Sequence, residues 1–206
     1  MSEALVLHEY AASGNCYKVR LAAAHAGVAL ERREYDIMKG ETRTSEFLAK
    51  VNANGRIPVL QAGGRFIPES NAACYFIAGG SGLIPPDRFD HADMLHWMFW
   101  EQYNHEPNIA TLRFWMGWVG LDQLTEAQRL QIPLKRQAGT AALELMDRHL
   151  KGREWLVGNA MSLADICLFA YTHVADEGGF DLELYPNVIA WMERIMRDPK
   201  HVAMDD

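Results

Sequence analysis

The order of short apolar runs in the first 80 residues constrains the fold of this chain more than any other feature. Residues 4–8 and 29–35 read as strands on either side of a helical segment at 15–26. Gly27 ends that segment, because glycine readily adopts the left-handed conformation that closes a helix. A second helical stretch, SEFLAKV, follows after polar residues. The opening pattern therefore predicts strand, helix, strand and helix in that order.

The rest of this region reads as a hairpin followed by a helix. The apolar strand IPVLQA, the glycine pair at 63–64 and the strand RFIP predict two strands joined by a tight turn. The run ESNAACYFIAGG then has the pattern of a third helix. Combined with the first half, this order predicts an α/β domain with the thioredoxin-like arrangement.

The remaining residues read as helical. No strand pattern interrupts 91–206, where apolar and aromatic residues recur at helical spacing. A Gly- and Pro-rich segment, SGLIPPDRFD, separates the two regions and reads as a linker. We therefore expect a thioredoxin-like domain at 1–81, a linker at 82–91 and an all-α helical bundle at 92–206.

Composition excludes several classes of protein. With 27 acidic and 20 basic side chains, the formal charge of −7 offers no basic surface for nucleic acid or for an anionic membrane. The three cysteines, Cys16, Cys74 and Cys167, have neither C-x-x-C nor paired metal-ligand spacing, so neither a disulfide framework nor a metal site is expected. MSEALVLHEY lacks a secretory leader pattern, and no apolar run reaches the roughly 20 residues of a membrane span. We expect a cytoplasmic protein.

A first motif lies between the first strand and the first helix. Ser13-Gly14-Asn15-Cys16 precedes the helix, whose free N–H groups and positive dipole end stabilise an anion such as a thiolate. The hydroxyl of Ser13 can donate a hydrogen bond to the thiolate of a bound ligand. The alternative is that Ser13 only caps the helix, since serine is a preferred N-cap residue.

A second motif is Asn54-Gly55-Arg56-Ile57-Pro58-Val59, where a proline enters an otherwise apolar strand. Such a proline indicates either a cis peptide bond or a strand at the edge of a sheet. With a cis bond at Pro58, the backbone of Ile57 can pair with a peptide-like ligand. A plain edge strand is the competing interpretation.

A third motif, Glu69-Ser70, opens the third helix. Ser70 and the free backbone N–H groups can hold a carboxylate, while Glu69 can pair with an ammonium group. A γ-glutamyl group carries both charges. By itself, such a pair more often serves ordinary helix capping.

The order and spacing of these motifs resemble the glutathione-binding domain of the cytosolic glutathione transferase family, in particular bacterial serine-type members with theta-, nu- and zeta-like features. The resemblance extends over nearly the whole chain, and it implies a thioredoxin-like domain followed by a helical one. The Ser162-Leu-Ala-Asp165 capping box is similarly placed in a buried helix of that family, so we interpret Asp165 as structural.

The resemblance implies roles for individual residues. Ser13 and Asn15 match the positions that activate the glutathione thiol, with Tyr10 as a second choice and Cys16 as a structural residue. The glutathione-binding residues carried over are Ile57 and Pro58 for the cysteinyl backbone, Glu69 and Ser70 for the γ-glutamyl end, and Lys39, Thr42 and Arg56 near the glycyl carboxylate.

The second substrate is expected against the helix WMFWEQYNHEPNIATLRFW. The residues that can line this aromatic pocket are Tyr103, His105, Arg113 and Trp115. The alternative is that these aromatic side chains form an interhelical core. The resemblance further implies glutathione as co-substrate, a small hydrophobic electrophile, a role in detoxification and a homodimer.

Two other functions remain open from the sequence. One is disulfide reduction or a glutathione-dependent isomerisation like that of the zeta class, whose S-x-x-x-[WY]-[RK]-V-R pattern is similar to SGNCYKVR. The other is a non-enzymatic interaction module, because a fold alone does not establish activity. The presence of Ser13, Pro58, Glu69 and Ser70 together argues against that module.

Overall fold

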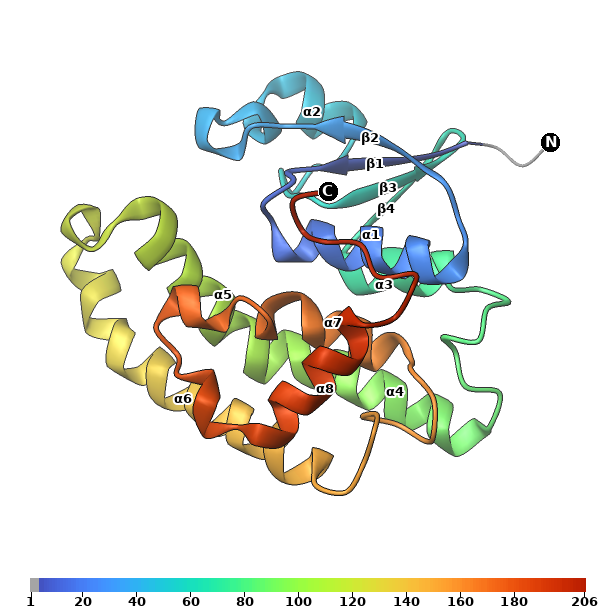
Figure 1. Ribbon diagram of the computed structural model, residues 1–206. Helices are drawn as coiled ribbons and strands as arrows, with labels where there is room; N and C mark the ends of the chain where they lie inside the picture. Colours follow the sequence, from blue (N-terminus) through green and yellow to red (C-terminus); the bar gives the residue numbers. More distant parts are fainter. Residues whose placement is uncertain (1–3) are drawn as a thin grey trace. The chain divides into compact units, whose positions relative to one another are not determined.

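The computed structural model describes residues 4–206, which divide into two compact units. The first comprises the residues up to Ile84 together with Pro199–Asp206, and the second comprises Pro85–Asp198 (Figure 1). The first unit is thioredoxin-like and the second is helical, so the predicted fold class is confirmed. The terminal segment belongs to the first unit, although the sequence places it next to the helical one.

A mixed four-stranded sheet forms the first unit, with the strand order β2-β1-β3-β4. The strands are β1 (Leu5–Glu9), β2 (Leu30–Glu34), β3 (Val59–Ala62) and β4 (Arg65–Pro68). β1 and β2 are parallel, whereas β3 is antiparallel to both β1 and β4. A parallel pair requires a crossover, and the first helix supplies it.

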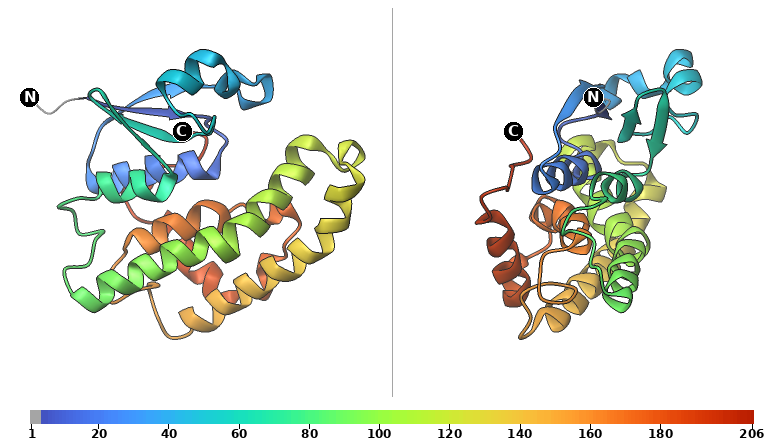
Figure 2. Two further views of the ribbon diagram at one scale, coloured as in Figure 1. Left: turned by 180° about the vertical axis from the view of Figure 1, so that it is seen from behind. Right: turned by 90° about the vertical axis from the view of Figure 1, so that its right-hand side faces the viewer.

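Helices cover both faces of this sheet. The helices α1 (Gly14–Ala26) and α3 (Ser70–Ile77) pack together on one face, and α2 (Ser45–Lys50) lies on the opposite face (Figures 1 and 2). Two 3₁₀ segments, Ile37–Lys39 and Glu41–Arg43, lead into α2. As predicted, α1 ends at Gly27, whose φ of 70° is left-handed.

The core of the first unit is built from apolar residues of the sheet and of the helices α1 and α3. Leu7, Leu60, Val19 and Ala73 are all fully buried. Burying each large aliphatic side chain contributes roughly 1.5–3 kcal/mol. This packing holds the ends of β1, α1 and α3 at fixed positions.

The second unit contains helices and no strand among residues 85–198. Its elements are α4 (Arg88–Trp100), a π-helical turn (Glu101–His105), α5 (Glu106–Phe114), a second π-helical turn (Trp115–Val119), a 3₁₀ segment (Leu121–Gln123), α6 (Glu126–Leu150), α7 (Leu163–Thr172), 3₁₀ segments (Ala175–Gly178 and Leu182–Leu184) and α8 (Pro186–Met196). Within the described part of the chain, no helix is both long enough and apolar enough to cross a membrane.

A helix cap sets the start of α4 inside the segment predicted as a linker. The carboxylate of Asp87 accepts hydrogen bonds from the backbone N–H groups of Phe89 and Asp90, at 2.8 and 3.0 Å. Asp87 thereby satisfies two of the N–H groups that an α-helix leaves unpaired at its first turn.

Asp165 joins three segments of the helical unit. Its carboxylate accepts hydrogen bonds from the N–H of Ser162 at 2.8 Å, from the N–H of Leu156 at 2.9 Å and from the indole of Trp191 at 2.9 Å. Asp165 is fully buried, and burial raises the pKa of its carboxyl group. The predicted capping box is therefore confirmed, and it also anchors α8.

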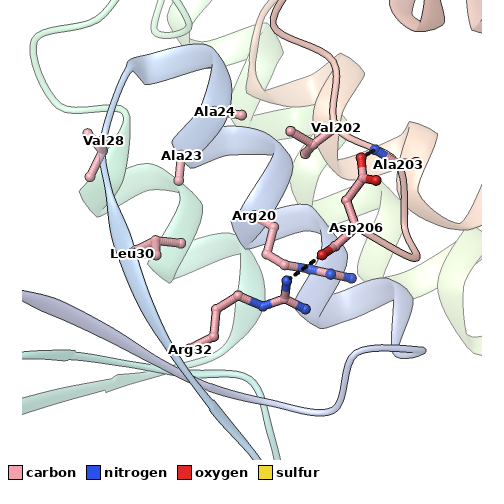
Figure 3. Close-up of a pocket in the computed structure, with 9 residues that line it drawn as sticks. All are labelled: Arg20, Ala23, Ala24, Val28, Leu30, Arg32, Val202, Ala203 and Asp206. Carbon is pink, nitrogen blue, oxygen red and sulfur yellow. Dashed lines mark hydrogen bonds between the residues drawn. The ribbon is translucent and has the colours of Figure 1, made fainter.

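The terminal segment 199–206 lies against α1 and β2 of the first unit (Figure 3). Three of its backbone carbonyls accept hydrogen bonds from side chains of that unit: Val202 from Tyr17 at 2.7 Å, Met204 from Arg20 at 2.7 Å and Asp206 from Arg32 at 2.9 Å. Both arginines also pair with the fully buried carboxylate of Glu9. The segment, α1 and β2 line an open pocket of about 260 Å³.

Candidate functional site

The turn between β1 and α1 places Ser13 at the helix N-terminus. Ser13 is extended, its N–H donates to the carbonyl of Tyr10 at 2.9 Å, and α1 begins at the next residue. Its side chain makes no capping hydrogen bond to the helix backbone. Ser13 thus occupies the cap position without making a capping hydrogen bond, which weakens the interpretation of Ser13 as a cap alone.

Cys16 lies in the first turn of α1 and is fully buried. Its sulfur accepts a hydrogen bond from the N–H of Tyr10 at 3.4 Å and also contacts the Ser13 side chain through a hydrogen bond. Burial raises the pKa of the Cys16 thiol to about 12, which outweighs the hydrogen bonds and the nearby Arg20 that lower the pKa. A neutral thiol is a poor nucleophile, which agrees with the interpretation of Cys16 as a structural residue.

Asn15 and Ser70 connect the first and third motifs. The hydroxyl of Ser70 donates a hydrogen bond to Oδ1 of Asn15 at 3.1 Å. Asn15 lies in the first turn of α1 and Ser70 begins α3, so the N-termini of two helices meet at this bond. Each N-terminus carries unpaired N–H groups and a partial positive charge, so their junction is a favourable position for an anion.

Glu69 adopts an unusual backbone conformation immediately before α3. Its φ is 71°, and it is the only residue other than glycine with a positive φ among residues 4–206. A non-glycine residue in such a conformation is strained by about 1–3 kcal/mol, and strain of this kind concentrates at functional sites. The exposed side chain of Glu69 therefore lies where a binding function is expected.

In the second motif, the structure has the cis peptide bond and not the plain edge strand. The Ile57–Pro58 peptide bond is cis, and Pro58 is buried directly before β3. Arg56 is exposed and Ile57 is half-buried.

Arg43 connects the 3₁₀ segment before α2 to this motif, a contact that the sequence analysis missed. Nη1 of Arg43 donates to the carbonyl of Asn54 at 3.1 Å. A Cβ atom at Gly55 would lie 2.7 Å from that nitrogen and 3.0 Å from the carbonyl of Thr42, and Gly55 has a φ of 63°. Buried Thr42 is thus beside the second motif, and only glycine allows this approach.

Lys39 is exposed at the protein surface. It is 76% exposed and pairs with Asp36 at 2.9 Å. The hydrogen bond from Lys39 lowers the pKa of Asp36, and the same contact raises the pKa of Lys39. Solvent screens such a pair strongly, so its contribution to stability is small.

The residues predicted for the second-substrate pocket occupy different environments within the helical unit. Tyr103 is 87% exposed, whereas His105 is fully buried with Nε2 2.9 Å from Oγ1 of Thr172. Arg113 is buried and forms an ion pair with Glu177 at 2.7 Å.

Arg113 and Trp115 each take part in a contact between a cation and an aromatic ring. The guanidinium of Arg113 lies 4.8 Å from the ring centroid of Trp118, and Nζ of Lys135 lies 5.7 Å from the centroid of the buried Trp115. These contacts fix Arg113 and Trp115 inside the helical unit, and the assignment of all four residues to a substrate pocket stays a prediction. No cluster of three potential metal ligands occurs among residues 4–206.

The chain thus has a thioredoxin-like unit, in which the N-termini of α1 and α3 meet at one hydrogen bond, and a second, helical unit. The family described as "Glutathione S-transferase, N-terminal domain" matches residues 5–79, and "Glutathione S-transferase, C-terminal domain" matches residues 125–199. The chain therefore belongs to the glutathione S-transferase family.

Individual relatives agree with this assignment. A glutathione S-transferase from Pseudomonas fluorescens Pf-5 is 44% identical, with a TM-score of 0.92 over 98% of this chain and 99% of its own. A possible glutathione S-transferase from Rhodopseudomonas palustris is 40% identical, with a TM-score of 0.91 over 98% of this chain and 90% of its own. The glutathione S-transferase-like protein LUC7 from a Fusarium species is 30% identical over 91% of this chain and 86% of its own length.

Proposed function

We propose that this protein binds glutathione, converts its thiol to a thiolate and directs the thiolate at a small hydrophobic electrophile. The observation that carries the proposal is the hydrogen bond from Ser70 to Asn15, which joins the first turns of α1 and α3 next to Ser13. This junction supplies the polar donors and the positive potential that a thiolate requires.

Ser13 and Asn15 are the proposed catalytic residues. The hydroxyl of Ser13 and the amide of Asn15 donate hydrogen bonds to the glutathione sulfur, which favours its charged form. The thiol proton passes to solvent, and the sulfur electron pair then forms the bond to the electrophilic carbon. At an aryl halide the carbon–halogen bond breaks, and the halide leaves with its electron pair. A fall of one unit in the thiol pKa corresponds to about 1.4 kcal/mol, which one charge-assisted hydrogen bond can supply.

The other motifs bind the remaining parts of glutathione. The N–H groups of α3 bind the γ-glutamyl carboxylate, and the Ser70 hydroxyl joins them when its hydrogen turns from Asn15 to the ligand. The exposed carboxylate of Glu69 pairs with the ammonium group. The backbone of Ile57 pairs with the cysteinyl residue. The glycyl carboxylate then lies toward the segment containing Lys39, Thr42 and Arg56.

The test is an ultraviolet titration of the thiolate of bound glutathione against pH. We expect the thiolate to appear well below the free thiol pKa of roughly 8.5, and we expect Ser13→Ala to return the pKa toward that value. Ser81→Ala is the matched control, because the Ser81 hydroxyl donates to the carbonyl of Ala78 in the same unit, outside the site. Failure to bind glutathione, or an unchanged pKa in Ser13→Ala, would refute the proposal.

Conjugation is preferred over disulfide reduction because Cys16, in the first turn of α1, is buried and its burial favours the neutral thiol. With Cys16 protonated, a reductase would have to use a second glutathione as the resolving thiol. Turnover of a glutathione mixed disulfide without activity on aryl halides would show that the protein is a disulfide reductase instead.

We also propose a cytoplasmic homodimer, and sedimentation at micromolar concentration tests the dimer.

A further inference from the structure

A second cavity is lined by residues of α2 and of the sheet. Figure 1 shows α2 on the sheet face opposite α1 and α3. Its volume is about 370 Å³, which falls within the range of roughly 300–1,000 Å³ found for small-molecule sites. The side chains that decide its chemistry are His8, Arg33, Tyr35, Phe47, Lys50 and Phe66. Ser13, Asn15, Glu69 and Ser70 do not line it, so it is distinct from the glutathione site.

Aromatic rings form the walls of this cavity. His8 and Tyr35 are stacked with their centroids 5.6 Å apart, and Tyr35 meets Phe47 edge to face at 5.0 Å. Phe66 completes the wall, with its centroid 5.9 Å from His8. Tyr35 and Phe66 are only half-buried, so they offer ring surface to a ligand. Such walls favour a flat aromatic group through offset or edge-to-face contacts.

His8 is held neutral at the base of the cavity. Gln61 donates from Nε2 to the carbonyl of Gly63 at 2.9 Å, so its Oε1 accepts from Nε2 of His8 at 2.9 Å. Nδ1 of His8 then accepts from the hydroxyl of Tyr35 at 2.9 Å. Burial lowers the pKa of His8, the Gln61 hydrogen bond raises the pKa, and the positive charge of Arg33 lowers it further. His8 therefore contributes no charge at neutral pH.

The charged groups around the cavity are cationic in sum. Arg33 is exposed, and its side chain has no hydrogen bond or ion pair with any residue in 4–206. Lys50 pairs with Glu46 at 3.0 Å, but both are more than 70% exposed, so water screens that pair. Two positive charges and one negative charge leave one net positive charge beside the aromatic walls.

We propose that this cavity binds a small planar aromatic carboxylate. The ring lies against Tyr35 and Phe66, and the carboxylate reaches Arg33, whose guanidinium matches a carboxylate with two parallel N–H donors. The net positive charge disfavours an aromatic cation, and the aromatic walls offer little to an inorganic anion. This site is independent of glutathione activation.

The test uses 2-naphthoate as the probe in calorimetric titrations of the full chain saturated with glutathione. We expect saturable one-to-one binding that Arg33→Gln weakens at least tenfold, because the charge-assisted contact between the carboxylate and the guanidinium is lost. Arg65→Gln is the matched control, since Arg65 is an exposed cation on the same sheet that does not line the cavity. We expect 2-naphthamide, which has the same ring without the charge, to bind more weakly than 2-naphthoate.

A spectroscopic readout separates this cavity from any other site for 2-naphthoate. A carboxylate near His8 stabilises the imidazolium, so NMR titration should show a higher His8 pKa in the complex than in the free protein. We expect Phe66→Leu to weaken binding as well. Absence of saturable binding, equal affinity in Arg33→Gln and Arg65→Gln, or a His8 pKa that does not move would overturn the proposal.

Discussion

Ser13 and Cys16 show how two neighbouring residues of similar chemistry acquire different roles. Both lie at the start of α1, where a helix dipole favours anions. Cys16 is fully buried, and the loss of hydration outweighs the dipole and its hydrogen bonds. Ser13 is only half-buried at the helix end, so its hydroxyl can meet the sulfur of a ligand. Exposure therefore decides which of the two can serve an incoming thiol.

We predict that Cys16 resists thiol reagents in the folded protein. Its pKa of about 12 keeps it protonated at pH 8, and Cys74 and Cys167 are fully buried as well. Ellman's reagent at pH 8 should detect no thiol in the native protein and all three after unfolding in guanidinium. Rapid labelling of the native protein at Cys16, located by mass spectrometry, would contradict this picture.

The same pKa shift has a defined sign for stability. Because folding raises the pKa of Cys16, the protonated thiol contributes stability fully below its ordinary pKa of 9.0. That contribution is lost as the pH rises through about 12.

At the scale of elements, α7 depends on one buried carboxylate. Asp165 caps the first turn of α7 and also accepts hydrogen bonds from Leu156 and Trp191. Those donors come from a loop and from α8, so one side chain couples three segments of the helical unit. Capping alone is worth about 1 kcal/mol, and the remaining bonds make this residue more important than an ordinary cap.

We predict that Asp165→Asn lowers the free energy of unfolding by about 2–4 kcal/mol. The amide NH₂ group replaces one of the two carboxylate oxygens, so the buried donors that face this oxygen lose their acceptor. Urea denaturation followed by circular dichroism measures the change. Asp122→Asn is the control, since Asp122 is exposed, and its stability should be unchanged within about 0.5 kcal/mol. Equal stability of the two variants would show that Asp165 is not a structural anchor.

At the scale of the whole molecule, the two ends of the first unit are far apart in the sequence. Residues 199–206 contain turns and irregular backbone but no helix or strand, yet they belong to the thioredoxin-like unit. Tyr17, Arg20 and Arg32 donate to three of their carbonyls. The chain therefore returns to its first unit after completing the helical one, and hydrogen bonds from side chains replace those of regular structure.

We predict that Tyr17→Phe destabilises the protein by about 1 kcal/mol, the value of one hydrogen bond, and accelerates amide exchange across 199–206. Hydrogen exchange measured by mass spectrometry follows the segment directly. Tyr103→Phe is the control, because it also removes a phenolic hydroxyl but from a side chain that is 87% exposed. It should leave both the stability and the amide exchange of 199–206 unchanged. Slow exchange in 199–206 of Tyr17→Phe would mean that the Val202 contact is dispensable.

Local patterns were sufficient for the elements of this protein. Strand and helix periodicity, Gly27 as a helix stop and the Ser162–Asp165 capping box each depend on neighbours within a few residues, and each is found in the structure. The same holds for the thioredoxin-like order, because each strand and helix follows from its own apolar pattern.

Contacts between distant segments could only come from the tertiary structure. The hydrogen bond between Asn15 and Ser70, the approach of Arg43 to Gly55, and the return of 199–206 to α1 join residues that no local pattern connects. The burial that holds Cys16 neutral has the same origin, because packing around a side chain depends on residues from several elements. Sequence alone thus determined which elements form and which residue types they present, whereas tertiary packing decided which of those residues meet and which charges they carry.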